Sequence, residues 1–149
     1  MKNIFLLVIP ALIAFSCDET KSDGYVDNGC GLELTLVKWS ASQSGDQRAD
    51  EKLAWTETIT LSPDSTFFKR REHDGTTREA TGRYIYVTID GRKFVELTYS
   101  QREDFIRNSC SADTEHIEVK SSTLFINGEW AACDGPVLEY KAKALPCDN

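Results

Sequence analysis

The side chains that could carry chemistry in this chain are five cysteines, two histidines and scattered carboxylates. His73 lies beside Asp74 in a predicted turn and His116 follows Glu115, and nothing in the sequence holds either ring as a general base, so both are expected to be solvated surface histidines. The patterns Gly-x-Ser-x-Gly and His-Glu-x-x-His and a glycine-rich phosphate loop are absent. Carboxylates distant in sequence could still meet after folding. Otherwise we expect no catalytic residue, no metal site and no cofactor.

Composition is typical of one acidic domain. The 149 residues carry a formal net charge of -7, and 40% of them are hydrophobic. We expect no nucleic-acid partner, because nucleic-acid phosphates require a cationic face. Residues 66–107 hold nine basic and seven acidic side chains. This segment could bind an anionic group, but we interpret its charges as the solvated face of a sheet.

The first residues are typical of an export signal. Lys2 precedes an apolar run from Ile4 to Ile13, shorter than the roughly 20 residues that span a bilayer. The ending Ser16-Cys17 resembles the lipobox of bacterial lipoproteins, with Ala14 where leucine is usual. The resemblance implies that residues 1–16 are a cleaved signal peptide and that Cys17 is lipidated. The alternative is an ordinary secretory signal and a free Cys17.

Residues 17–29 are predicted to tether the domain, residues 30–149, to a membrane. The tether is polar and rich in Asp and Gly, and as a flexible coil it would reach about 20 Å. Several acyl chains on Cys17 would make the anchor stable. We expect the protein in the bacterial cell envelope, at the outer membrane on its periplasmic face or at the surface. Asp18 leaves the inner membrane open, because some bacteria retain lipoproteins there through that position.

The remaining four cysteines are an even number in an exported chain, which predicts two disulfides. No Cys-x-x-Cys pair is present, which argues against zinc and thioredoxin-type chemistry. With Cys17 lipidated and the others paired, no thiol would remain to act as a nucleophile.

Apolar and polar residues alternate with the period of strands from residue 31 to residue 144. Turn-forming sequences separate the runs, and no segment has a helical stripe, although the loops 40–53 and 101–114 each have room for a helical turn. We predict eight strands, at residues 32–39, 55–62, 66–72, 78–89, 93–100, 115–120, 122–131 (with a bulge at Asn127-Gly128) and 137–144. Short connections favour an all-β antiparallel up-and-down meander closed into a barrel, with a β-sandwich as the alternative.

This topology predicts the disulfide pairing. In a meander, Cys110 and Cys133 lie at one end, while Cys30 and Cys147 lie at the other. Disulfides need Cα atoms within about 7 Å, whereas the ends of a strand are roughly 17 to 20 Å apart. We therefore expect Cys30–Cys147, which would join the first strand to the last, and Cys110–Cys133.

Three motifs carry a family resemblance: Leu-Val-Lys-Trp at 36–39, Ile-Thr-Leu-Ser-Pro-Asp-Ser-Thr-Phe at 59–67, and Gly-Arg-Tyr at 82–84. Together with the lipobox they resemble the small lipocalin-like lipoproteins of Gram-negative bacteria. In that family a strand ending in Leu-Thr-Phe-Ser-x-Asp-Gly-Thr-Phe precedes a Gly-x-Tyr strand, and here Ser65 replaces the turn glycine. The resemblance covers most of the mature domain and implies a lipocalin-like barrel.

An eight-stranded barrel holds packed side chains or one small ligand. The residues predicted to face inward are Leu34, Leu36, Ile59, Leu61, Ile85, Val87, Val95, Leu97, Leu124, Ile126, Leu138 and Tyr140. The candidate ligand-lining residues are Trp39, Trp55, Phe67, Tyr99 and Trp130, which as aromatics could equally belong to the core.

Two functions follow from different uses of a barrel. The first is a non-catalytic binding module for a small apolar ligand, which needs an internal cavity. The second is a protein-binding envelope lipoprotein, such as an inhibitor or immunity factor, which needs an exposed site over a filled core. Ala80-Thr81-Gly82-Arg83-Tyr84 resembles a loop of membrane-bound lysozyme inhibitors. A structural role in a larger envelope assembly is a third option. We expect a monomer that contacts the membrane through its lipid.

Overall fold

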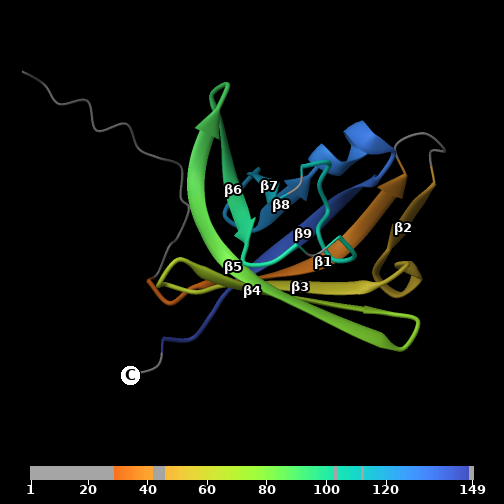
Figure 1. Ribbon diagram of the computed structural model, residues 1–149, viewed down its shortest axis with the longest axis horizontal. Helices are drawn as coiled ribbons and strands as arrows, with labels where there is room; N and C mark the ends of the chain where they lie inside the picture. Colours follow the sequence, from red (N-terminus) through yellow and green to blue (C-terminus); the bar gives the residue numbers. More distant parts are fainter. Residues whose placement is uncertain (1–28, 42–45, 103, 112, 148–149) are drawn as a thin grey trace, which may run out of the picture.

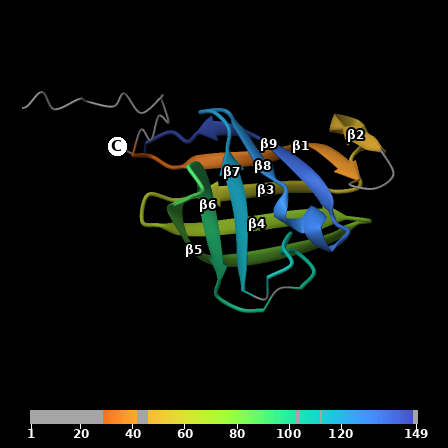
Figure 2. The same ribbon diagram turned by 90° about the horizontal axis from the view of Figure 1, so that it is seen from above.

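The computed structural model describes residues 29–41, 46–102, 104–111 and 113–147. These residues form an antiparallel sheet in which β1 pairs with both β3 and β9, so that eight strands close into a barrel (Figures 1 and 2). A short ninth strand, β2, pairs with β1 outside the ring. The predicted fold class, an all-β up-and-down barrel of the lipocalin-like type, is confirmed.

The strands are β1 (Leu32–Ala41), β2 (Gln47–Ala49), β3 (Thr56–Leu61), β4 (Thr66–His73), β5 (Thr76–Ile89), β6 (Arg92–Tyr99), β7 (Thr114–Val119), β8 (Leu124–Asn127) and β9 (Pro136–Ala144). Two 3-10 helices are present among the described residues, η1 (Asp50–Lys52) and η2 (Glu129–Cys133). The longest strand, β5, bends along its length, and its second half rises with β6 as a hairpin (Figure 1).

The eight predicted strands are all present, but one of them ends early. The strand predicted at residues 122–131 stops at Asn127, because Gly128 leaves the extended conformation (φ -109°, ψ -5°) and the chain continues into η2. The expected bulge at Asn127-Gly128 is therefore wrong, and Trp130 lies on a helical turn. The sequence prediction also omitted β2, whose three residues are all exposed and carry no alternating pattern.

Left-handed residues make the hairpin turns. Asp74-Gly75 joins β4 to β5 and Asp90-Gly91 joins β5 to β6, each with positive φ at both positions, as a two-residue type I′ turn requires. Ser65 also has positive φ (66°), at the turn position that glycine occupies in the resembled family.

The interior of the barrel is filled by side chains from all eight strands of the ring. Eight of the twelve residues predicted to face inward are buried, namely Leu34, Leu36, Ile59, Leu61, Val95, Leu97, Leu138 and Tyr140. The other four, Ile85, Val87, Leu124 and Ile126, are not buried.

Pairing register explains the four misplaced residues. On β5, Gly82 pairs with buried Tyr99, so the even-numbered residues face inward and Ile85 faces outward. A Cβ at Gly82 would lie 2.6 Å from the ring of Phe67, and glycine is therefore needed beneath that ring. On β8, Phe125 pairs with buried Tyr140 and takes the inward position.

Two disulfides join the predicted pairs. Cys30–Cys147 links the residues flanking β1 and β9 with a Cα–Cα distance of 4.8 Å, and Cys110–Cys133 links the β6–β7 loop to η2 with 5.9 Å. The predicted signal peptide, Cys17 and the tether up to residue 28 lie outside the described residues. Within the described part of the chain, no helix has the length and apolar character needed to cross a bilayer.

The two disulfides close loops of different length, 117 and 23 residues apart in sequence. Loop-closure entropy predicts that C30S/C147S lowers the free energy of unfolding by about 5 kcal/mol and C110S/C133S by about 3 kcal/mol. Urea unfolding of both variants checks the order. A larger loss in C110S/C133S would contradict it.

Candidate functional site

Charged and polar side chains occupy one end of the barrel interior, and we call them the interior network. Its members are Glu57, Lys69, Arg71, Tyr99, Asn108, Glu115, Asn127 and Tyr140. All of them are buried, and seven come from the inward faces of strands, while Asn108 comes from the β6–β7 loop. The network therefore stands where a lipid-carrying barrel would have an apolar cavity.

Glu57 is the first centre of the network. Its carboxylate accepts hydrogen bonds from Arg71 Nε at 2.6 Å, Tyr140 Oη at 2.6 Å and Asn108 Nδ2 at 2.9 Å. Lys69 Nζ lies 3.2 Å from the same carboxylate. Four donors thus surround one buried charge.

Glu115 is the second centre. It accepts from Lys69 Nζ at 2.8 Å, Tyr99 Oη at 2.6 Å, Asn127 Nδ2 at 2.8 Å and the backbone N–H of Asn108 at 3.1 Å. Lys69 therefore joins the two carboxylates across the lumen. Two buried cations balance two buried anions, which is the condition under which charges are found inside proteins.

Contacts within the network set the protonation states of Glu57, Tyr99 and Tyr140. Burial by itself would raise the pKa of Glu57, but Lys69, Arg71 and the hydrogen bonds from Tyr140 and Arg71 outweigh burial and lower that pKa. Burial, together with Glu115, raises the pKa of Tyr99 well above its usual value, and burial together with Glu57 does the same for Tyr140. The carboxylate of Glu57 is ionised, and the two phenols are neutral donors.

The β6–β7 loop closes this end of the barrel. Arg71 donates to the backbone oxygens of Phe105 and Ile106 at 3.0 and 3.2 Å, and also to the side-chain oxygen of Asn108. Ile106 is only 1% exposed. Glu57 and Glu115, which are distant in sequence, thus lie close enough to share Lys69. Their oxygens already accept hydrogen bonds from the chain itself, and the β6–β7 loop covers them.

Four of the five candidate ligand-lining aromatics lie in two pairs, and Trp39 lies apart from them beside Arg48. Phe67 and Tyr99 are buried, with ring centroids 5.1 Å apart. Trp55 and Trp130 are 6.2 Å apart, and the guanidinium of Arg71 lies 4.7 Å from the Trp55 ring. All three tryptophans, Trp39 included, are partly buried and pack against the core.

Trp55 also borders an open groove of about 360 Å³, together with Leu53 and His73. The side chain of His73 is exposed, as predicted. The aromatic side chains thus contribute to filling the barrel, and one of them reaches its outer surface.

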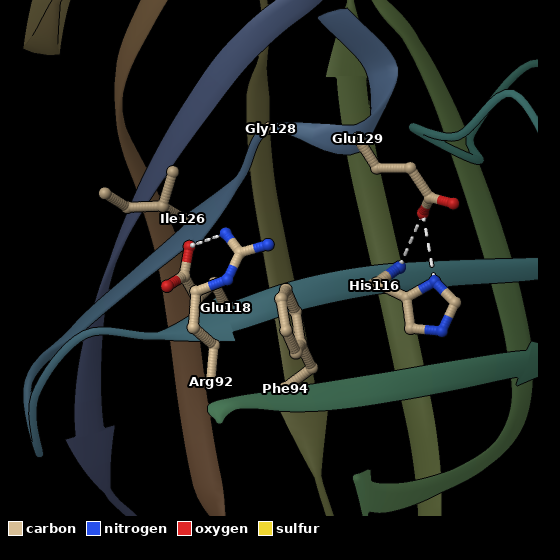
Figure 3. Close-up of a pocket in the computed structure, with 7 residues that line it drawn as sticks. All are labelled: Arg92, Phe94, His116, Glu118, Ile126, Gly128 and Glu129. Atoms are coloured by element: carbon tan, nitrogen blue, oxygen red, sulfur yellow. Dashed lines mark hydrogen bonds and ion pairs between the residues drawn. The ribbon is translucent and has the colours of Figure 1, made fainter. Parts of the chain in front are cut away.

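An open hollow on the outside of β6, β7 and β8, with a volume of about 360 Å³, is the candidate functional site, and we call it the outer cleft (Figure 3). Its lining residues are Arg92, Phe94, His116, Glu118, Ile126, Gly128 and Glu129. The first two come from β6, the next two from β7 and the rest from β8 and the start of η2. Alternation along the strands points these side chains away from the interior network.

His116 is held between two carboxylates in the outer cleft. Its Nδ1 lies 3.2 Å from Glu129, and its backbone N–H donates to Glu129 at 3.0 Å (Figure 3). Its Nε2 lies 3.0 Å from Glu96. The side chain is 21% exposed. His116 is therefore a paired residue of the cleft, and the expectation of a solvated surface histidine is wrong because Glu129 reaches it from η2.

Arg92 occupies the other side of the outer cleft. Its guanidinium lies 5.3 Å from the centroid of the Phe94 ring and 3.5 Å from Glu118. Lys120 also pairs with Glu118, at 2.7 Å. An aromatic face next to carboxylates is suited to a cationic group, and here a half-exposed arginine of the chain itself takes that position.

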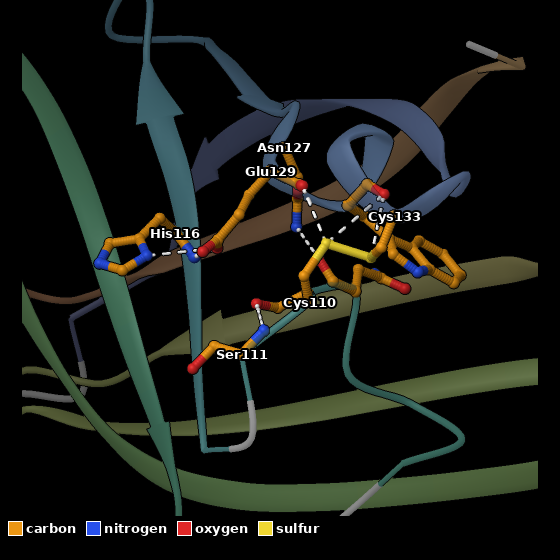
Figure 4. Close-up of a disulfide and its surroundings, with 9 residues drawn as sticks. Cys110, Ser111, His116, Asn127, Glu129 and Cys133 are labelled. Atoms are coloured by element: carbon orange, nitrogen blue, oxygen red, sulfur yellow. Dashed lines mark hydrogen bonds and ion pairs between the residues drawn. A yellow bond between two sulfur atoms is a disulfide. The ribbon is translucent and has the colours of Figure 1, made fainter. Parts of the chain in front are cut away.

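The Cys110–Cys133 disulfide positions the wall of the cleft (Figure 4). It fixes η2, which begins with Glu129, to the β6–β7 loop. Asn127 Nδ2 donates to the backbone oxygen of Asn108 at 2.8 Å beside this disulfide. The loop that covers the interior network and the turn that carries Glu129 are therefore one connected unit.

The period-two pattern of the sequence places three charged residues of the interior network on the inward faces of their strands. Glu57 shares strand parity with inward Ile59, and Lys69 and Arg71 share parity with inward Phe67. The interpretation of these charges as a solvated face is wrong for Lys69 and Arg71 but holds for exposed Arg70. The outer cleft had no comparable signal, because its wall depends on η2.

In the described part of the chain, no three His, Cys, Asp or Glu side chains are placed to hold a metal ion. Comparison of the chain with family models, with curated proteins and with solved structures finds no match. The lipocalin-like family therefore remains a resemblance of motifs and of fold.

Replacing Glu57 leaves Lys69 and Arg71 with one buried carboxylate fewer. We expect E57Q to lower the free energy of unfolding by about 3 to 5 kcal/mol near neutral pH, and E79Q, on the exposed face of β5, to change it little. Because the folded-state pKa of Glu57 is lowered, its contribution is present above pH 4.5 and is lost as the pH falls through the folded pKa. The difference in free energy of unfolding between wild type and E57Q, measured by denaturant unfolding, should become smaller in acid. A difference in free energy of unfolding that does not change with pH would contradict a lowered pKa of Glu57 in the folded state.

The raised pKa values of Tyr99 and Tyr140 predict a loss of stability in alkali. Both contributions are present below pH 10 and are lost as the pH rises toward the folded-state pKa values, because unfolded tyrosines ionise first. We expect Y140F to have a shallower alkaline decline than wild type, measured by denaturant unfolding at increasing pH. If the free energy of unfolding fell equally steeply with pH in both proteins, Tyr140 would ionise as readily in the folded state as in the unfolded state.

Proposed function

We propose that this protein is a lipid-anchored, non-catalytic binding protein of the cell envelope, and that it recognises a protein partner through the outer cleft. Of the two binding functions considered from the sequence, a carrier of a small apolar ligand and a protein-binding lipoprotein, the geometry favours the second. The observation that carries this choice is the interior network, which occupies the space that a carried ligand would need.

A carrier needs an enclosed, mostly apolar cavity of about 300 Å³ or more. At one end of this barrel Lys69 pairs with Glu57 on the neighbouring strand and with Glu115 across the lumen, and the loop that carries buried Ile106 closes the opening. At the rim near the tip of the β5–β6 hairpin there is a hollow of about 160 Å³ bordered by Tyr86 and Val119. That hollow is smaller than a typical ligand site.

The outer cleft has the composition of a protein-recognition site. Phe94 and Ile126 supply an apolar centre, and charged side chains surround it. Glu118 and Glu129 place carboxylates beside the aromatic ring, and Arg92 already rests there. We therefore expect the partner to insert an arginine or lysine side chain, displacing Arg92 from Phe94. The net charge of -7 would steer a basic partner toward the protein.

The cleft is also held in its binding shape before the partner arrives. Strands β6, β7 and β8 are paired side by side, and the disulfide fixes η2 above them. Preorganisation lowers the entropy lost on binding. A rigid barrel that supports a surface site fits an inhibitor or immunity factor, and the Cys17 anchor would keep that site at the membrane.

The alternating residues of β6 allow a direct test, because Phe94 and Glu96 face outward and Val95 and Leu97 face inward. We expect a Gly-Arg-Arg-Gly peptide to shift the NMR signals of the outward pair, and F94A to weaken its binding about tenfold or more. F68A, which removes a partly exposed ring from β4 outside the cleft, is the matched control and should bind normally.

Two probes separate the alternatives. A Gly-Glu-Glu-Gly peptide should leave the cleft signals unchanged, because its charge is wrong for the carboxylates. Laurate, added as an apolar ligand, should leave Val95 and Leu97 unchanged. Laurate-dependent shifts of those inward residues, with no response to the arginine peptide, would favour the apolar-ligand carrier and contradict the proposal.

A further inference from the structure

The second half of β5 carries an unusual group of exposed apolar side chains. Ile85 is 55% exposed, Tyr86 is 42% exposed and Ile89 is 40% exposed. They lie beyond Arg83, the last residue of β5 that pairs with β4, on the part of the strand that rises as a hairpin (Figure 1). Ile85 and Ile89 lie on the outer face of the strand, whereas Tyr86 lies on its other face, at the rim hollow. We call these three residues the hairpin patch. Clustered exposure of this kind marks an interaction surface.

The described chain begins next to the hairpin patch. Gly29 borders an open hollow of about 450 Å³ whose other walls include Ile85 and Tyr86. Cys30–Cys147 fixes this point to the barrel. A lipid on Cys17 would be connected to Gly29 by residues 18–28, and a flexible tether of that length reaches about 20 Å.

The strand geometry places the tip of the hairpin within about the 20 Å that the tether reaches. Ile89 is four residues from Ile85, which corresponds to about 13 Å of extended strand. A bilayer that holds the lipid is therefore close to the whole hairpin patch. The tryptophans Trp55 and Trp130 belong to the opposite end of the barrel, where the β4–β5 turn also lies.

The side chains of the tip suit the membrane interface. Isoleucine and tyrosine bury apolar surface at the headgroup level, and basic residues contact lipid phosphates. Lys93 is exposed beside the patch and borders the same rim hollow as Tyr86. Burial raises the pKa of Tyr86 to about 12, so its hydroxyl group remains neutral.

We propose that the β5–β6 hairpin inserts Ile85, Tyr86 and Ile89 into the interface of the bilayer that holds the lipid anchor, which orients the barrel with its β4–β5 turn away from the membrane. This inference rests on the lipid anchor of the proposed function. It adds a second, non-covalent contact with the membrane and a fixed orientation of the domain.

Tryptophan substitutions test the orientation. The full acylated chain is reconstituted in phosphatidylglycerol vesicles with brominated acyl chains, which quench tryptophan at short range. We expect I89W to lose about half of its added emission, because interfacial side chains lie about 5 to 10 Å into the headgroup and acyl boundary. T77W, on the same outer face of β5 at its other end, is the matched control and should be unquenched, as should the native tryptophans.

The outcomes distinguish the inference from its premise. Equal quenching of I89W and T77W, or none in either, on a chain whose mass shows the acyl groups would overturn the orientation and leave the anchor standing. A chain that carries no acyl groups would overturn both. An I89W emission shift that depends on protein concentration, without bromolipid quenching, would assign the hairpin patch to a second copy of the chain and overturn the membrane contact.

Discussion

The ion pairs that Lys69 makes with Glu57 and Glu115 are the constraint on which the rest of this structure depends. They connect β4 with its neighbour β3 and, across the lumen, with β7. Burying four charges is costly in free energy, and a packed apolar core of the same volume would often be as stable. Ion pairs differ from apolar contacts in requiring one geometry. A barrel built around them cannot be emptied or re-registered without leaving a charge unpaired.

This constraint leaves the proposed binding surface on the outside of the barrel. Arg71 ties the network to the β6–β7 loop, and the same loop is bonded through Cys110 to η2. Glu129 at the start of η2 then reaches His116 on the outer face of β7. The interior network, the closing loop and the outer cleft are thus mechanically connected, which accounts for a surface cleft that is held in place.

Much of the fold could be predicted from the sequence, because barrels are encoded by local signals. The alternation of apolar and polar residues predicted the strands, and the Asp-Gly pairs predicted the hairpin turns. The meander topology predicted the pairing of both disulfides. Whether a given strand residue points into the barrel or away from it was harder to predict. Ile85 on β5 is as apolar as a core residue, and only its pairing with Glu96 on β6 places it outside. The outer cleft could not be predicted, because Glu129, which forms part of its wall, was expected on a strand and lies on η2 instead.

The two proposed surfaces constrain each other through β6. Phe94 in the outer cleft pairs with Val87, which lies between Ile85 and Ile89 of the hairpin patch. Arg92 of the cleft pairs with Ile89 itself, and Phe94 lies two residues further along β6. This side of the cleft therefore begins at the tip that would contact lipid, and Phe94 lies about 7 Å from it. A partner that binds there must present its basic side chain close to the membrane surface, where anionic headgroups also attract it. Under both proposals, membrane-associated basic proteins would have an advantage over soluble ones, since the anchor and the hairpin together would restrict the orientations that the encounter has to sample.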